Sequence, residues 1–91
     1  MKARASHILV ATEQECVDLM EKIQNYTEFA NFAQKFSMCP SSAKGGDLGY
    51  FQPKQMVPEF DKVVFSAELN KVHGPVKTQF GYHLIWITER S

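Results

Sequence analysis

The spacing of apolar residues along this 91-residue chain changes from one segment to the next. The first clear pattern lies at residues 3–10. This segment ends in a run of aliphatic side chains, which predicts a β-strand. Alternation places His7 and Leu9 on one face of that strand and Ile8 and Val10 on the other. Because both faces carry apolar side chains, we expect this strand to lie in the centre of its sheet.

Helical spacing follows in two segments. Thr12 starts a capping-box pattern, and apolar residues then recur at steps of three and four up to about Asn25, which predicts a first helix. Thr27 is the expected N-cap of a second helix, whose phenylalanines again follow helical spacing. That helix should end before Cys39, because Pro40 disfavours helical geometry in the residue that precedes it.

The second half of the chain predicts a short strand at residues 48–51 and a third helix from Pro58 to residue 67. Proline suits the first turn of a helix because it has no N–H group to lose there. Residues 73–78 and 81–88 then form two strands joined by a tight turn. This order predicts a small α+β domain with helices packed around a four-stranded, mainly antiparallel sheet.

Composition narrows the functional classes. Ten basic and ten acidic residues cancel, and no basic stripe is present, so we expect neither nucleic acid nor a membrane surface as partner. No apolar run approaches the ~18 residues of a transmembrane helix, and no signal peptide is recognisable. We therefore expect one domain over residues 1–91, a free-standing cytoplasmic monomer whose two cysteines are free thiols.

Cys39 is the first candidate for chemistry. With His7 or His83 as a base it could act as a nucleophile, but the chain is too short for the two lobes that usually flank a protease cleft. A zinc site lacks the usual ligand spacing, and Cys16 lies on the apolar side of its helix. The glycine pair at residues 45–46 lacks the lysine and hydroxyl residues of a phosphate-binding loop.

The histidines are more informative. His7 and His83 each share a strand face with aliphatic residues, so one interpretation is two core imidazoles that are hydrogen-bonded to their surroundings. Their position on neighbouring strands, near Cys39 and an aromatic-rich loop, favours a functional site instead. His73, next to the dipeptide at residues 74–75, is expected to be a solvated loop residue.

Four segments resemble, in order, the motifs of the parvulin peptidyl-prolyl cis/trans isomerases, and most closely those of the small single-domain bacterial members. They are SHILV at 6–10, FSMCPSSAKGGDLGYF at 36–51, QMVPEFDKVVF at 55–65 and GPVKTQFGYHLI at 74–85. The resemblance implies a parvulin-like (FKBP-like) α+β fold, with a four-stranded antiparallel sheet surrounded by four helices in the order β-α-α-α-β-α-β-β. The added short helix falls at residues 41–44.

The resemblance also implies a site and an activity. It implies catalytic roles for His7, Cys39, Thr78 and His83, and a proline-binding pocket formed by Leu48, Met56 and Phe60 with Phe80 at its rim. Thr78 matches a hydroxyl that hydrogen-bonds within the histidine pair. No cofactor and no metal are implied, and the expected partners are proline-containing peptides and unfolded or partly folded proteins.

The loop after the first strand departs from one branch of the family. Members that require phosphorylated Ser/Thr–Pro have a basic loop there, whereas this chain has only Ala11 and Thr12, followed by Glu13. A phosphate would find no cationic partner, so we expect unphosphorylated peptides with an apolar residue before proline. Two alternatives stay open at this point: a docking module with little activity, and a thiol redox protein that uses Cys39.

Overall fold

The computed structural model describes residues 1–91 and contains one four-stranded antiparallel sheet with the strand order β2-β1-β4-β3. The strands are β1 (Ala3–Val10), β2 (Asp47–Phe51), β3 (Val72–Thr78) and β4 (Gly81–Arg90). β1 and β4 pair along most of their length in the middle of the sheet. The predicted central position of the first strand is therefore confirmed.

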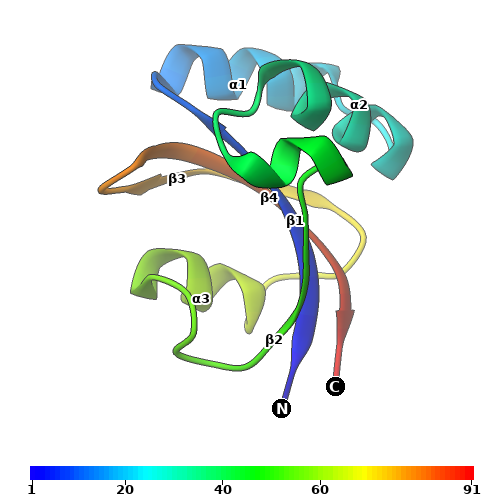
Figure 1. Ribbon diagram of the computed structural model, residues 1–91, viewed down its shortest axis with the longest axis vertical. Helices are drawn as coiled ribbons and strands as arrows, with labels where there is room; N and C mark the ends of the chain where they lie inside the picture. The colour runs from blue at the N-terminus through cyan, green and yellow to red at the C-terminus, as the bar shows by residue number, and fades with distance from the viewer.

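Helices cover both faces of this sheet (Figure 1). α1 (Glu13–Lys22) and α2 (Tyr26–Phe36) lie on one face together with a short 3₁₀ helix, η1 (Pro40–Lys44), and α3 (Pro58–Val64) lies on the other. The α+β class and the antiparallel sheet are as predicted. The structure has three α-helices, and the short helix expected near residues 41–44 is this 3₁₀ turn.

The predicted boundary between α1 and α2 is wrong by a few residues. The start of α1 is as expected, since the Thr12 hydroxyl accepts a hydrogen bond from the Glu15 N–H at 3.3 Å. However, α1 ends at Lys22, and Asn25 rather than Thr27 caps α2 by accepting from the Glu28 N–H at 2.9 Å. An asparagine is at least as good an N-cap as a threonine, so the earlier of two possible caps begins the helix.

α3 is also shorter than predicted, because it ends at Val64 rather than at residue 67. At this end the helix meets a residue of β4, far along the chain. Arg90 donates hydrogen bonds through Nη1 to the carbonyls of Val64 and Ala67, at 2.9 and 2.7 Å. Carbonyls at a helix C-terminus lack partners within the helix, and a cation there is favourable. This contact therefore stabilises the chain where it leaves α3.

Each face of the sheet has its own hydrophobic core. Between the sheet and α1–α2 lie nine buried residues, including Ile8, Phe29 and Leu84. Between the sheet and α3 lie seven, including Phe60, Ile85 and Ile87. The alternation predicted for β1 and β4 thus assigns their side chains to two cores. None of the helices has the length and apolar composition needed to cross a lipid bilayer.

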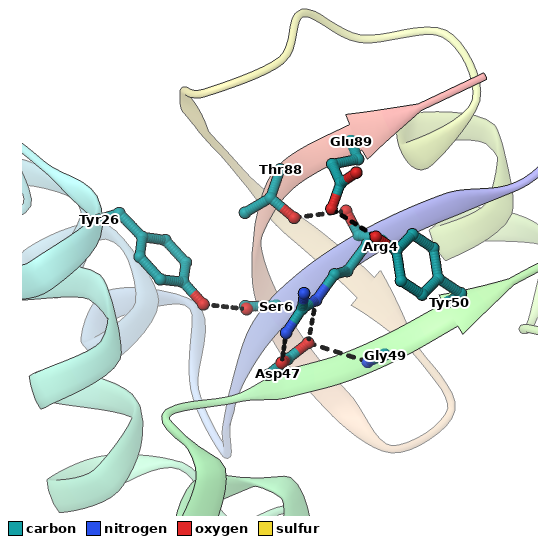
Figure 2. A network of polar contacts seen from close by, with 8 residues as sticks. All are labelled: Arg4, Ser6, Tyr26, Asp47, Gly49, Tyr50, Thr88 and Glu89. Carbon is teal, nitrogen blue, oxygen red and sulfur yellow. Dashed lines mark hydrogen bonds and ion pairs between the residues drawn. The ribbon is translucent and has the colours of Figure 1, made fainter.

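A group of polar side chains joins the edge strand β2 to β1 and β4, and we call it the edge network: Arg4, Asp47, Tyr50 and Glu89 (Figure 2). Arg4 donates from Nε and Nη2 to the two carboxylate oxygens of Asp47, at 3.2 and 2.5 Å. The Tyr50 hydroxyl donates to Glu89 at 2.7 Å. The hydrogen bond from Arg4 lowers the pKa of Asp47, so this network is charged at neutral pH.

Candidate active site

The site begins with two histidines on neighbouring strands. In the antiparallel pairing of β1 with β4, His7 lies opposite Ile85 and Leu9 lies opposite His83, so the two histidines are diagonal neighbours on one face. Their Nδ1 atoms are 3.0 Å apart and are joined by a hydrogen bond, with the ring planes within 17° of each other. Segments 76 residues apart in sequence thus form one pair.

A hydroxyl group extends this pair into a chain of hydrogen bonds. Thr78 Oγ1 lies 2.8 Å from His83 Nε2, and it also accepts from the backbone N–H of Phe80 at 3.2 Å. One assignment of the hydrogens gives the largest number of these polar atoms a hydrogen-bond partner. In it, the Thr78 hydroxyl donates to His83 Nε2, and His83 Nδ1–H donates to His7 Nδ1. We call His7, His83 and Thr78 the buried network. The hydrogen bond to Thr78 is where the family resemblance implied it.

Burial keeps both imidazoles neutral. His7 and His83 are only 6% and 4% exposed. Burial, with a smaller contribution from the neighbouring His83, lowers the pKa of His7 to about 4, and burial also lowers the pKa of His83. Phe60 adds to this environment, because its ring meets both imidazoles edge to face at 82°, with centroids 5.6 and 5.9 Å away. The pair is therefore a neutral, apolar-sided surface at pH 7.

This surface is part of the wall of a cavity of about 370 Å³. Of the eight residues predicted for the site, seven line it: His7, Cys39, Leu48, Met56, Phe60, Phe80 and His83. Thr78 does not line the cavity and is connected to it by its hydrogen bonds to His83 and to the Phe80 N–H. No lysine, arginine, aspartate or glutamate lines it. The structure thus brings the predicted residues together around one apolar space, while their roles stay predictions.

Four further residues line the cavity and were not predicted: Leu9, Met38, Pro40 and Val57. Each is a sequence neighbour of a predicted residue or shares its strand face. Leu9 follows His7 by two positions in β1, and Met38 and Pro40 flank Cys39. The signal for these residues was the alternation of β1 and the direct adjacency to Cys39, which the motif comparison did not use.

Cys39 and the glycine pair owe their positions to close backbone packing. Cys39 is half-buried with a free thiol, and it immediately precedes η1. Gly45 and Gly46 follow η1, both with positive φ, and the Gly46 carbonyl accepts from the His7 N–H at 3.0 Å. A Cβ on Gly46 would lie 2.4 Å from the His7 carbonyl oxygen. The glycine pair is therefore explained by this close approach to β1.

Two other candidate residues lie away from the cavity. His73 was expected in a solvated loop, but it is half-buried in β3, and its Nε2 lies 2.7 Å from the Glu68 carbonyl. The expectation was wrong because His73 is part of β3, where it pairs with Ile85 of β4. Cys16 is fully buried, and burial raises the pKa of its thiol to about 11. No group of three or more His, Cys, Asp or Glu side chains could hold a metal ion.

A family model described as the PPIC-type PPIase domain matches residues 1–91. This match gives the class of protein, a peptidyl-prolyl isomerase domain. The chain belongs to the PPIC-type PPIase domain family, as the motif resemblance implied.

Individual relatives agree with this assignment. The foldase protein PrsA of Geobacillus sp. (strain WCH70) is 42% identical over 91 residues, which are 99% of this chain and 33% of that protein. The solution structure of NmPin, the parvulin of Nitrosopumilus maritimus, has a TM-score of 0.81 and 35% identity, covering 97% of this chain and 96% of that one.

A third similar structure comes from the Campylobacter jejuni work on the virulence factor PEB4 and the periplasmic protein Cj1289, two SurA-like chaperones. It has a TM-score of 0.92 and 34% identity, covering 97% of this chain and 38% of that chain. The chain therefore spans about a third of the length of the curated relatives it matches. The PrsA relatives extend beyond the matched region, whereas NmPin is matched over almost its whole length.

Proposed function

We propose that this domain catalyses cis/trans isomerisation of Xaa–Pro bonds in unphosphorylated peptides and in unfolded or partly folded proteins. The observation that carries the proposal is the apolar cavity walled by a neutral histidine pair, in a chain whose whole length matches the PPIase domain family. Membership of the family supplies the reaction, and the cavity supplies a place for the proline ring.

The proposed mechanism is non-covalent. Rotation about the prolyl bond must break amide resonance, and the twisted amide has less charge separation than the planar one. A cavity without a charged lining residue favours the less polar state and excludes water from the amide. Met56 and Phe60 would hold the ring, since a deformable thioether and a flat aromatic face both suit a pyrrolidine.

In this proposal the polar residues shape the site and transfer no proton to the peptide. The histidines are hydrogen-bonded to each other and neutral at pH 7, so they form a fixed wall behind Phe60. Cys39, half-buried in the cavity lining, would lie next to the substrate carbonyl as an electrostatic and steric neighbour. Covalent attack by its thiol is not required, because no bond is made or broken in the reaction.

The substrate class follows from the missing cations. No lysine or arginine lines the cavity, and the loop after β1 consists of Ala11 and Thr12. A phosphorylated residue before proline would lose its hydration there and gain no ion pair. We expect no advantage for phospho-Ser/Thr–Pro peptides. An advantage of more than about tenfold in kcat/KM, equivalent to about 1.4 kcal/mol, would contradict this substrate class.

The activity is tested by NMR exchange spectroscopy on an unphosphorylated Ala-Leu-Pro-Phe peptide, with and without catalytic amounts of the protein. The uncatalysed exchange takes tens of seconds, and we expect the protein to accelerate it. Met56→Ala should lower kcat/KM by about tenfold or more, because it removes apolar contact with the ring. Met20→Ala is the matched control, since Met20 is also half-buried but packs on the α1–α2 core.

The same experiment separates the alternatives. Binding of the peptide without acceleration would favour a docking module. If neither binding nor acceleration occurs with a series of Xaa–Pro peptides, the proposed activity is wrong. Rapid labelling of Cys39 by a chromogenic disulfide at neutral pH, together with absent isomerase activity, would favour the redox alternative.

The remaining assignments concern the protein in its cell. We propose that residues 1–91 form one domain that acts as a monomer in the cytoplasm, and the free thiols of Cys16 and Cys39 support a reducing compartment. One structural relative comes from work on a periplasmic protein, so location is a point to test directly. Cell fractionation with an antibody against this domain, and sedimentation of the purified chain, test the two assignments.

A further inference from the structure

We propose that Met38, together with Leu9 and Phe80, forms the subsite that reads the side chain of the residue before proline; this rests on the isomerase function proposed above. We call these three residues the rim. All three line the cavity, and they come from the segment after α2, from β1, and from the turn between β3 and β4. None of the three belongs to either buried core cluster.

Two of the three rim side chains are unusually exposed for apolar side chains of this size, whereas Leu9 is half-buried. Met38 is 62% exposed and Phe80 is 60% exposed, whereas the cavity residue Phe60 is 3% exposed. Exposed side chains of this kind contribute little to folding but offer apolar surface to a ligand. Met38 and Phe80 line the same cavity as Phe60 and Met56. A peptide whose proline ring lies in this cavity would therefore pass over them, so we take the peptide chain next to the proline as the ligand of this surface.

Hydrogen bonds and close packing hold the backbone under the rim in place, so the three residues keep a fixed position relative to one another. The Met38 N–H donates to the Leu9 carbonyl at 2.8 Å, and the Leu9 N–H donates to the Ser37 hydroxyl at 3.0 Å. On the other side, a Cβ on Gly81 would lie 3.3 Å from Leu9 Cδ1, so the turn that carries Phe80 packs on the same leucine. Leu9 thus connects the segments of Met38 and Phe80.

Chain geometry assigns this surface to the residue before proline. Consecutive Cα atoms are 3.8 Å apart across a trans peptide bond and about 2.9 Å apart across a cis bond. With the ring between Met56 and Phe60, Cys39 beside the carbonyl of the rotating amide lies beside the residue before proline, because that carbonyl belongs to it. Met38 directly precedes Cys39 and lines the same cavity, so the side chain of that residue lies next to Met38. A charged side chain at that place would lose water without gaining a partner, and an apolar one would gain contact with the rim.

The test changes the charge of the rim. Met38→Lys and Met38→Glu keep an unbranched side chain at an exposed position, so both variants should fold. With peptides Ala-Xaa-Pro-Phe, Met38→Lys should raise the kcat/KM ratio of Xaa = Glu over Xaa = Leu by about fivefold. Met38→Glu should do the same for Xaa = Lys over Xaa = Leu. A purely structural role of Met38 would change all peptides in parallel.

Phe36→Lys is the control, because Phe36 is 50% exposed and lies outside the cavity, so the same net charge is added without a change in these ratios. Ratios that stay constant in both Met38 variants, with active wild-type protein, would overturn the subsite and leave the isomerase proposal standing. Ratios that change only for peptides varied after the proline would also overturn the subsite. Wild-type protein that accelerates no peptide would overturn both proposals.

Discussion

Two polar networks start on the same strand, β1, and they differ in almost every physical property. The buried network extends from His7 to His83 and Thr78, under Phe60, and its imidazoles are neutral at pH 7. The edge network extends from Arg4 to Asp47, at the surface of the sheet, and it is an ion pair (Figure 2). In Arg4 and Asp47, 41% and 22% of the side-chain surface remain exposed.

The difference shows how burial selects the kind of polar contact. Inside the protein a charge loses hydration, so the histidines lose their protons and join through neutral hydrogen bonds. At the surface, water screens the ion pair, which leaves it charged but weakly stabilising. The neutral network gives the cavity a wall without charge, whereas the charged network positions the edge strand. Each of the following predictions tests this contrast, from the largest expected effect to the smallest.

The largest effect is expected from the glycine behind the buried network. Gly46→Ala places a Cβ in a residue with φ +85° and within 2.4 Å of the His7 carbonyl oxygen. We expect the free energy of unfolding to fall by about 3 kcal/mol, measured by urea denaturation. Gly49→Ala, beside Asp47, is the matched control: φ is +73°, but nothing lies within 4 Å, so about 1 kcal/mol is expected. Equal losses of unfolding free energy in the two variants would show that backbone strain, and not the close contact with His7, causes the destabilisation.

Acid should act on the buried network first. An unfolded histidine titrates near pH 6.5, but the pKa of His7 in the folded state is lowered to about 4. Between these values the unfolded chain binds the proton and the folded chain does not. The neutral His7 therefore contributes fully to the free energy of unfolding above about pH 6.5. As the pH falls from 6.5 towards 4, this free energy decreases by about 3 kcal/mol because of His7. His83 acts in the same direction.

The edge network should respond at lower pH. The pKa of Asp47 is lowered below its ordinary value of 3.8, so its contribution is present above that pH and is lost only as the pH falls through the lower folded-state value. Urea unfolding between pH 7 and 3, with Asp47→Asn alongside the wild type, separates the two windows. Stability that stays constant from pH 6.5 to 4 would contradict the neutral, buried state of the histidines.

Threonine-to-valine substitutions, which keep the side-chain shape, compare one hydroxyl group of the buried network with one beside the edge network. Thr78→Val removes the partner of both His83 Nε2 and the Phe80 N–H, which leaves two polar groups unpaired. We expect a loss of about 2 kcal/mol in the free energy of unfolding and a slower isomerase reaction. Thr88→Val removes a hydroxyl that donates to the Arg4 carbonyl beside the edge network, and there less than about 1 kcal/mol is expected. A greater loss at Thr88 would reverse the comparison.

The smallest effect is expected at the ion pair itself. Asp47→Asn removes the charge but keeps a side-chain oxygen that can accept from the Gly49 N–H. We expect the melting temperature to fall by no more than about 4 °C, and by less in high salt. Calorimetry at low and high ionic strength measures both values. A larger fall that salt does not reduce would mean that the edge network is shielded from water like the buried one.

Much of the fold could be predicted because it depends on patterns within single segments. The alternation of residues 3–10 and 81–88 predicted two strands with two apolar faces, and both strands are central and buried on both sides. Helix ends were less predictable. α3 ends where Arg90 meets its last carbonyls, a contact between segments 26 residues apart that no local pattern contains.

The candidate site likewise has a part that the sequence predicted and a part that it did not. The motifs placed seven of its residues, and these do surround one cavity. Leu9 and Met38 lie within two of the motif segments, but which side chains of these segments face the cavity is decided only in the folded protein. The hydrogen bond between Met38 and Leu9 joins the segment after α2 to β1. These two segments come together only when α2 packs on the sheet.

The amino-acid sequence by itself determined the strands, the face on which each histidine lies and the family to which the chain belongs, since periodicity and local motifs carry that information. Only the tertiary structure decided that His7 and His83 form a hydrogen bond of 3.0 Å, that burial keeps them neutral, and that Met38 stands at the mouth of the cavity. The physical reason is that hydration, and with it charge, depends on which distant segments cover a side chain.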